Sequence, residues 1–166
     1  KVGLFDESLL SNEDYEFNTR IRASGGTVWL DPAIRSVYFA RSGLGSLARQ
    51  YSRYGYWKVQ MLRRYPGSLR WRQALPPVFV LSLAGLALLG LLAPWAWALL
   101  GLELALYLLV LLLAGAQVAI RQKDAALFAG VPLAIAVMHV SWGSAFLWGL
   151  VSPGEGRPAV NVEERA

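Results

Sequence analysis

Two neighbouring carboxylates, Glu13 and Asp14, open the densest acidic stretch of the chain. The stretch reads as the start of a helix, with Ser11 expected as the N-cap and Asp14 as the acid of a capping box. Glu16 and Arg20, four residues apart, are expected to pair on the helix surface. The chemical alternative is that Asp14 is a general base held in place by the helix end. The local sequence leaves both interpretations open.

A second polar cluster lies in an expected amphipathic helix that ends near residue 65. Gln50 and Arg53 are three residues apart and share a helix face, which Tyr54 and Trp57 adjoin. A planar guanidinium beside an amide suits the oxygens of a diphosphate, and aromatic rings suit the face of a sugar or base. The alternative is a basic helix in the membrane interface that contacts anionic headgroups, because its tyrosines and tryptophan stand between arginines.

Other kinds of catalytic site are poorly supported. The chain has no cysteine and one histidine, which is too few ligands for a zinc site and excludes thiol chemistry. It also lacks the glycine pattern of a dinucleotide-binding loop and the Gly-x-Ser-x-Gly pattern of a serine hydrolase. No metal-binding residues are therefore predicted.

The N-terminal segment is expected to be mixed α/β. Residues 12–24 should form a helix that ends at Gly25-Gly26, because glycine adopts a left-handed conformation without steric cost. Short strands are expected over residues 27–30 and 36–40. Residues 1–43 therefore read as part of an α/β domain that is too small to bury a full core alone.

A long apolar block fills the second half of the chain. Hydrophobic residues make up 55% of the whole chain, and its mean hydropathy is +0.39. The apolar runs are long enough for three crossings of a hydrocarbon core about 30 Å thick. Residues 1–43 are predicted to be a partial α/β domain, and residues 44–73 an interfacial helix with a basic linker. Residues 74–151 are predicted to contain three transmembrane helices, at about 75–92, 98–120 and 126–151. Residues 152–166 are predicted to be a disordered tail.

Two ionisable residues, Glu103 and His139, fall within the predicted spans. An ionisable group inside a membrane is a functional candidate by default. The structural alternative is a hydrated position near the interface for Glu103 and a hydrogen bond across helices for His139. A proton relay would need more polar partners than these spans contain.

Positive charge is concentrated before the apolar block. Residues 1–73 carry twelve Lys and Arg against six Asp and Glu, and the whole chain has a net charge of +5. Basic residues beside a hydrophobic block favour membrane lipids over nucleic acid as partners. The positive-inside rule then predicts a multi-pass protein of the cell inner membrane, with its N-terminal segment cytoplasmic and its C-terminal tail outside.

The order of these motifs resembles the second half of family 2 inverting glycosyltransferases, which have a GT-A fold. The resemblance is strongest to the membrane enzymes of succinoglycan and other exopolysaccharide synthesis, and it covers nearly the whole chain except the tail. It is carried by four short motifs: Gly3-Leu4-Phe5-Asp6-Glu7, Glu13-Asp14-x-Glu16-x-x-x-Arg20-x-Arg22-x-x-Gly25, Gln50-x-x-Arg53-Tyr54 with tyrosine in place of the family's tryptophan, and His139-Val140-Ser141-Trp142-Gly143.

The resemblance implies roles for these residues. Asp14, next to Glu13, would deprotonate the acceptor hydroxyl, and Gln50 and Arg53 would hold the diphosphate of a nucleotide-sugar donor. Tyr54 would face a sugar, and two further residues complete the predicted substrate-binding set: Arg20 and Trp57. The family's nucleotide-binding half, with its Asp-x-Asp metal motif, does not precede Lys1 in this sequence. We therefore expect a C-terminal portion that is inactive alone and binds no cofactor itself, with Mg²⁺ or Mn²⁺ used by the full-length enzyme.

The predicted fold class is thus an α+β membrane protein, with a partial GT-A domain, an amphipathic interfacial helix and three transmembrane helices. The predicted function is transfer of a hexose from a nucleotide-sugar, such as a UDP-hexose, to a lipid-linked or polysaccharide acceptor at the cytoplasmic membrane face. The alternative is a non-enzymatic membrane anchor or small subunit that docks partners through its basic N-terminal segment. A transporter is disfavoured, because the spans contain few polar residues.

Overall fold

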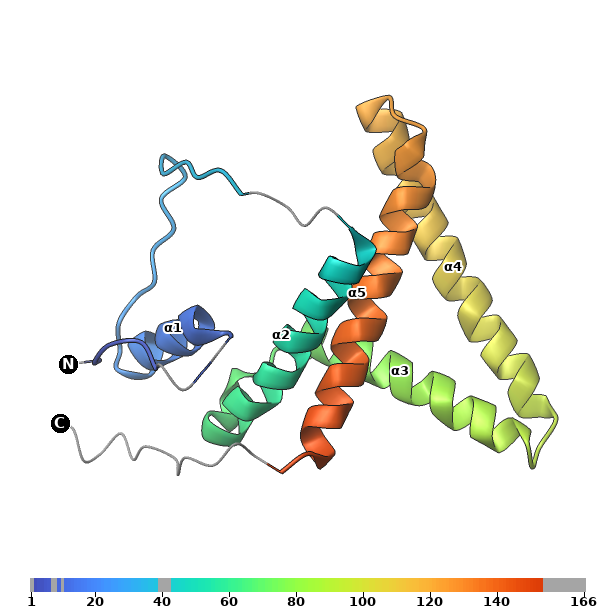
Figure 1. Cartoon of the computed structure of the whole chain (residues 1–166), viewed down its shortest axis with the longest axis horizontal. Helices are drawn as coiled ribbons and strands as arrows, with labels where there is room; N and C mark the ends of the chain where they lie inside the picture. Colours follow the sequence, from blue (N-terminus) through green and yellow to red (C-terminus); the bar gives the residue numbers. More distant parts are fainter. Residues whose placement is uncertain (1, 7–8, 10, 39–42, 154–166) are drawn as a thin grey trace.

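The computed structural model describes residues 2–6, 9, 11–38 and 43–153, and the regular elements in these ranges are all helical (Figure 1). Five are α-helices, and one is a single 3-10 turn that links α2 to α3. Their bounds are α1 Glu13–Ala23, α2 Leu44–Arg64, η1 Pro66–Ser68, α3 Trp71–Gly90, α4 Trp95–Gln122 and α5 Ala126–Val151.

The predicted α+β fold with a partial GT-A domain is wrong, because no strand forms in the described part of the chain. Residues 27–30 are an extended segment in which Trp29 and Leu30 are 83% and 87% exposed. Residues 36–38 are exposed and irregular, and the rest of the second predicted strand lies outside the described residues. Strand propensity reflects a fit to neighbouring strands and a covered face. The described chain offers this segment neither, so it remains a loop.

The prediction of three membrane-spanning helices is confirmed in length and composition. Helices α3, α4 and α5 have 20, 28 and 26 residues and mean hydropathies of 1.7, 2.3 and 1.6 in their most apolar windows. At 1.5 Å per residue each reaches about 30 Å or more, which is enough to cross a hydrocarbon core. Helix α3 begins at Trp71, a few residues before the predicted start.

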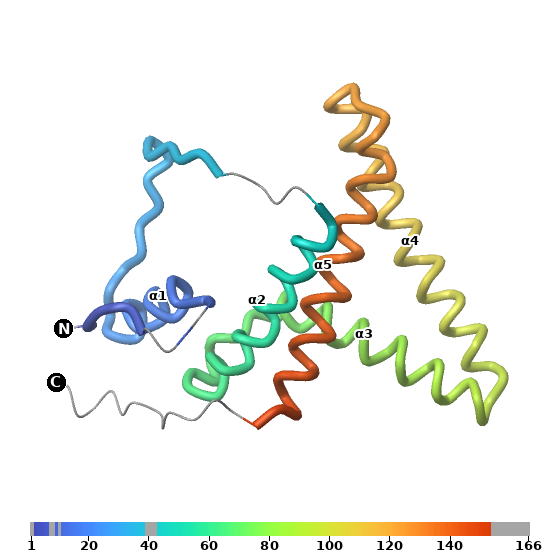
Figure 2. Tube along the Cα trace, viewed as in Figure 1, coloured from blue at the N-terminus to red at the C-terminus, as the bar shows by residue number. Residues whose placement is uncertain are grey.

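Helix α2 packs along α5, and the two run in the same direction (Figures 1 and 2). Gly55 is the point of closest approach, since a Cβ there would lie 2.3 Å from the backbone oxygen of Trp142. One turn further on, Val59 lies against Gly149. Small residues allow two helix backbones to approach closely, so these glycines fix the α2–α5 interface.

The end of this interface is held by Arg63. Its Nη2 atom donates to the carbonyl oxygens of Gly149 at 2.9 Å and Ser152 at 2.7 Å. The last carbonyls of a helix lack intrahelical donors and carry partial negative charge. The α2 guanidinium therefore caps α5 and ties the amphipathic helix to the third candidate span.

The three candidate spans are joined by polar contacts as well as by packing. Ser82 Oγ of α3 lies 2.5 Å from Glu103 Oε1 of α4, and Tyr107 Oη of α4 lies 3.1 Å from His139 Nδ1 of α5. The predicted hydrogen bond of His139 across helices is confirmed. Each ionisable group thus has a polar partner on a neighbouring helix, although the structural interpretation expected Glu103 to be hydrated near the interface.

Candidate functional site

The start of α1 differs from the predicted capping box. Asn12, not Ser11, is the N-cap residue, and its backbone is left-handed with φ of 66°. Its side chain does not cap α1 but donates from Nδ2 to the carbonyl oxygen of Tyr54 at 3.2 Å. Asparagine tolerates the left-handed conformation better than most residues. Asn12 therefore turns the chain into α1 and fastens the start of that helix to α2.

Glu13 and Asp14 are both exposed at this end of α1. Asp14 Oδ1 accepts a hydrogen bond from the backbone N–H of Tyr15 at 2.7 Å. This bond orients the carboxylate at the positive end of the helix, while the side chain stays open to solvent. An exposed, oriented carboxylate can accept a proton from a hydroxyl brought to it.

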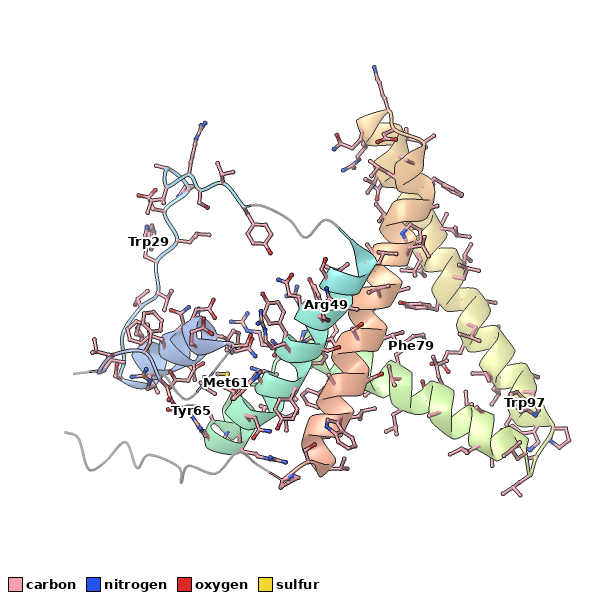
Figure 3. The ribbon with its side chains drawn as sticks, in the orientation of Figure 1. Trp29, Arg49, Met61, Tyr65, Phe79 and Trp97 are labelled. Carbon is pink, nitrogen blue, oxygen red and sulfur yellow. The ribbon has the colours of Figure 1, made fainter. Side chains whose placement is uncertain are left out.

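Gln50 and Tyr54 contact each other on α2, with Gln50 Nε2 donating to Tyr54 Oη at 2.7 Å. The same amide reaches Tyr38 Oη at 3.3 Å. Gln50 also lines a shallow pocket of about 300 Å³. The lining carries two guanidinium groups, one amide and one hydroxyl: Arg49, Arg53, Gln50 and Ser46 (Figure 3 labels Arg49). Such a surface offers several N–H donors to the oxygens of a diphosphate.

The structure brings the two predicted clusters to adjacent elements. Asn12 fixes the Asp14 end of α1 at Tyr54, which directly follows Arg53 in α2. The N-terminal turn of α1 is thereby held beside the part of α2 that lines the pocket. Their positions agree with a shared site, and the roles assigned to Asp14, Gln50 and Arg53 stay predictions.

Arg20 and Trp57, the other predicted substrate-binding residues, are engaged within the fold. Arg20 pairs with Glu16, with Nε–Oε1 at 2.6 Å and Nη2–Oε2 at 2.9 Å. It also donates to the carbonyl oxygens of Val2 and Leu4. Trp57 is 6% exposed and packs edge-on against Tyr56. Both side chains therefore have structural contacts, whatever further part they play.

The predicted Glu16–Arg20 pair forms, but it is not a surface pair. Glu16 is 1% exposed and lies beside Tyr65, the residue that follows α2. Burial and the neighbouring Glu16 carboxylate raise the pKa of Tyr65 to about 12, so its hydroxyl keeps its proton at neutral pH. Glu16 therefore links α1, the N-terminal segment and α2, a role that spacing alone did not reveal.

Replacing Glu16 by glutamine is expected to loosen this N-terminal segment. The change removes the charge that holds Arg20, and hydrogen bonds to charged groups contribute about 1.5–3 kcal/mol each. We expect faster amide hydrogen exchange over residues 2–23, with exchange in α3 to α5 unchanged. The control is Glu13→Gln, which alters an exposed carboxylate in the same helix turn. Equal exchange in the two variants would contradict the anchoring role.

Lys58 is the functional candidate that the sequence reasoning missed. It is 3% exposed, its Nζ donates to the carbonyl oxygen of Ser68 at 2.9 Å, and it lies 3.9 Å from the centre of the Tyr15 ring. Burial, with a smaller contribution from Arg70, lowers the pKa of Lys58 to about 8. A signal existed, because Lys58 falls on the same helix face as Tyr51, Tyr54 and Met61.

The described residues do not fit a metal site of their own. In residues 2–6, 9, 11–38 and 43–153, no three His, Cys, Asp or Glu side chains gather closely enough to hold an ion.

Comparison with known proteins gives two curated relatives, while no family model and no solved structure matches the chain. One is the dolichyl N-acetyl-alpha-D-glucosaminyl phosphate 3-beta-D-2,3-diacetamido-2,3-dideoxy-beta-D-glucuronosyltransferase of Methanococcus voltae, 24% identical over 148 residues. The other is succinoglycan biosynthesis protein ExoA of Rhizobium meliloti, 30% identical over 147 residues. The alignments cover 89% and 87% of this chain but only 42% of each relative.

The chain thus spans less than half the length of the curated relatives that it matches. It confirms the resemblance predicted from the motifs: the chain is related to glycosyltransferases of glycan and exopolysaccharide synthesis.

Proposed function

We propose that the chain is a portion of an inverting family 2 glycosyltransferase that acts at the cytoplasmic face of the cell inner membrane. The observation that supports this most is the hydrogen bond from Asn12 to the carbonyl of Tyr54. It brings the Glu13-Asp14 end of α1 to the helix that bears Gln50 and Arg53. The relationship to glycan-synthesising transferases agrees with it.

In the proposed reaction, Asp14 takes the proton of an acceptor hydroxyl. The freed oxygen attacks the anomeric carbon of a nucleotide-sugar, such as a UDP-hexose, and forms the new glycosidic bond. The bond from that carbon to the diphosphate oxygen breaks, and the nucleoside diphosphate leaves with the electron pair. Arg53 and Gln50 supply N–H donors to the negative charge that develops on the leaving group.

The proposed acceptor is a lipid-linked or polysaccharide glycan, since the site lies next to helices that can cross a membrane. Arg70 and Arg72 lie at the start of α3, and Arg121 and Lys123 lie at the end of α4. The positive-inside rule favours the cytoplasm for both groups, although the bonds of Arg63 place the end of α2 beside the C-terminal end of α5. In the full-length enzyme we expect Mg²⁺ or Mn²⁺ to be held by residues outside the described ranges.

The alternative is a non-enzymatic anchor that docks partners through its basic N-terminal segment. The bond between Asp14 Oδ1 and the Tyr15 amide favours it, because a first-turn acid that only stabilises a helix makes the same contact. The two proposals differ in whether the full-length protein transfers sugar.

The test is a transfer assay with the full-length protein in membrane vesicles, a radiolabelled UDP-sugar and a lipid-linked acceptor. The double substitution Gln50→Ala/Arg53→Ala is expected to weaken donor binding about tenfold or more, a loss of at least about 1.4 kcal/mol. The control is Arg35→Ala, which removes an exposed arginine outside the pocket. Absence of transfer by the unaltered protein, with every UDP-hexose supplied, would favour the anchor.

A further inference from the structure

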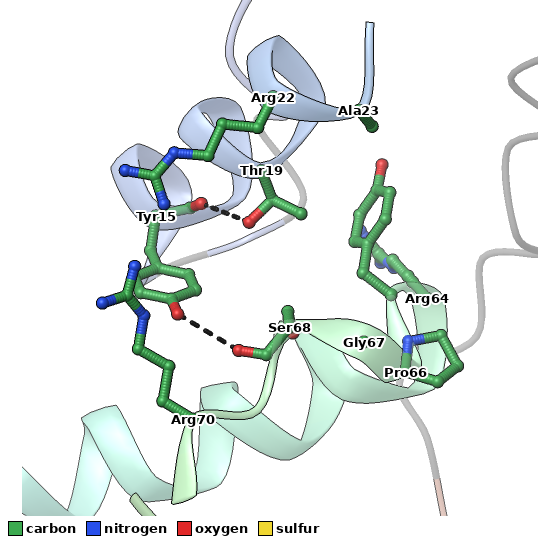
Figure 4. A pocket seen from close by; sticks show the side chains of 10 residues that line it. Tyr15, Thr19, Arg22, Ala23, Arg64, Pro66, Gly67, Ser68 and Arg70 are labelled. Atoms are coloured by element: carbon green, nitrogen blue, oxygen red, sulfur yellow. Dashed lines mark hydrogen bonds between the residues drawn. The ribbon is translucent and has the colours of Figure 1, made fainter. Parts of the chain in front are cut away.

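A second and larger pocket lies apart from the proposed donor site. It has a volume of about 580 Å³ and is bounded by α1 on one side and by the segment joining α2 to α3 on the other (Figure 4). Its polar lining combines guanidinium and hydroxyl groups: Tyr15, Thr19, Arg22, Arg64, Tyr65 and Arg70. None of these residues lines the pocket at Gln50 and Arg53.

The pocket has more positive than negative charge. Arg64 is neutralised by Asp6, with Nη1 and Oδ2 2.5 Å apart. Among the described residues the other ion pair joins Arg20 to Glu16, so neither Arg22 nor Arg70 has a carboxylate within 4 Å. Figure 4 shows these two guanidinium groups on the same side of the pocket, next to the ring of Tyr15. A bound anion would restore the charge balance there.

The buried side chain of Lys58, which contacts the pocket lining, adds to this positive charge. Lys58 Nζ donates to the carbonyl oxygen of Ser68, a residue of the pocket lining, and no described carboxylate pairs with it. Tyr15 Oη donates to the same carbonyl at 3.1 Å. A buried lysine without a counter-ion is costly, and an anion held nearby would lower that cost.

The position of the pocket restricts the ligand. Arg70 is the N-cap residue of α3, the first candidate span, and Trp71 follows with most of its surface exposed. Tryptophan and arginine beside a span are typical of the headgroup level of a membrane. A phosphate in this pocket would therefore lie where the polar end of a lipid lies, with α3 beside its hydrocarbon chain.

We propose that this pocket binds the phosphate or diphosphate group of a membrane lipid through Arg22 and Arg70. The inference deepens the proposed function and rests on it only in assigning the lipid as carrier of the glycan acceptor. Guanidinium groups bind phosphate oxygens through paired, charge-assisted hydrogen bonds. The donor diphosphate and the lipid phosphate would then occupy separate pockets.

The test measures binding of three probes to the purified full chain in detergent micelles: farnesyl diphosphate, inorganic pyrophosphate and farnesol. Farnesyl diphosphate is expected to bind at least about tenfold more tightly than either other probe, since only it has both a diphosphate group and a hydrocarbon chain. The substitution Arg22→Gln/Arg70→Gln should raise its dissociation constant about tenfold or more, a loss of at least about 1.4 kcal/mol. Arg22→Lys/Arg70→Lys, which keeps the charge but loses the paired donors, should raise the dissociation constant less than the glutamine variant does.

The control is Arg35→Gln/Arg121→Gln, which removes the same charge from exposed positions outside both pockets. Equal affinity of this control and the Arg22→Gln/Arg70→Gln variant would overturn the assignment. Pyrophosphate binding as tightly as farnesyl diphosphate would show a site for soluble phosphates, and farnesol binding as tightly would show a purely apolar one. The binding experiment contains no sugar donor, so its failure would not contradict the proposed sugar transfer. Conversely, a full-length protein that transfers no sugar would not contradict the lipid-phosphate site.

Discussion

Replacement of Asp14 by asparagine is expected to lower the rate of sugar transfer by the full-length protein about a hundredfold to ten-thousandfold. The amide oxygen of asparagine can still accept the Tyr15 N–H bond that orients the side chain at the start of α1. It cannot take a proton from the acceptor hydroxyl. Donor binding should stay nearly intact, because the Asp14 carboxylate is not part of the pocket at Gln50 and Arg53.

The chain offers a close control for this experiment. Asp31 is also an exposed carboxylate whose Oδ1 accepts a backbone N–H, that of Ala33 at 2.9 Å. Asp31→Asn therefore makes the same chemical change in a similar local setting, away from α2. We expect it to leave the transfer rate within about twofold of the unaltered protein. Full turnover by Asp14→Asn would remove the assignment of the base, and equal losses in both variants would show a general effect of lost charge.

Replacement of Gly55 by alanine is expected to destabilise the protein by about 1–3 kcal/mol, although alanine forms helices better than glycine. The added methyl group would lie 2.3 Å from the carbonyl oxygen of Trp142 and 3.1 Å from the amide nitrogen of Phe146. Both are backbone atoms of α5, so the contact cannot be relieved by turning a side chain. Helix α2 must move away from α5.

The sign of this effect distinguishes packing from helix propensity. Gly45 lies in the same helix, and a Cβ there would meet only Arg49 Nη1, at 3.9 Å. Gly45→Ala should therefore raise stability by up to about 1 kcal/mol. The measurement is thermal unfolding of both variants in detergent, followed by circular dichroism. A stabilising Gly55→Ala would mean that α2 and α5 are not held at the observed distance.

The membrane part of the fold was the most predictable from sequence. The thickness of a bilayer sets the length of an apolar helix, and the backbone must satisfy its hydrogen bonds within the segment. Neither requirement depends on a distant partner, so the runs around Leu75, Leu104 and Leu133 were sufficient.

The N-terminal segment was predicted less well, since its form depends on contacts made elsewhere. The short apolar runs around Trp29 and Val37 predict strands, but a strand exists only with a partner, and the described chain provides none. Ser11 was expected to cap α1, whereas Asn12 takes that position and reaches Tyr54, 42 residues away. No local pattern encodes such a contact.

By itself, the sequence determined the three apolar helices, the amphipathic helix α2 and the residue types of the proposed transferase site. Each follows from local periodicity, composition or a short motif. The tertiary structure decided that Asn12 ties the start of α1 to α2, that Glu16 is buried, and that a basic pocket lies where α2 leads into α3. These features arise from charges and carbonyls far apart in the chain, and only packing brings such groups within hydrogen-bonding distance.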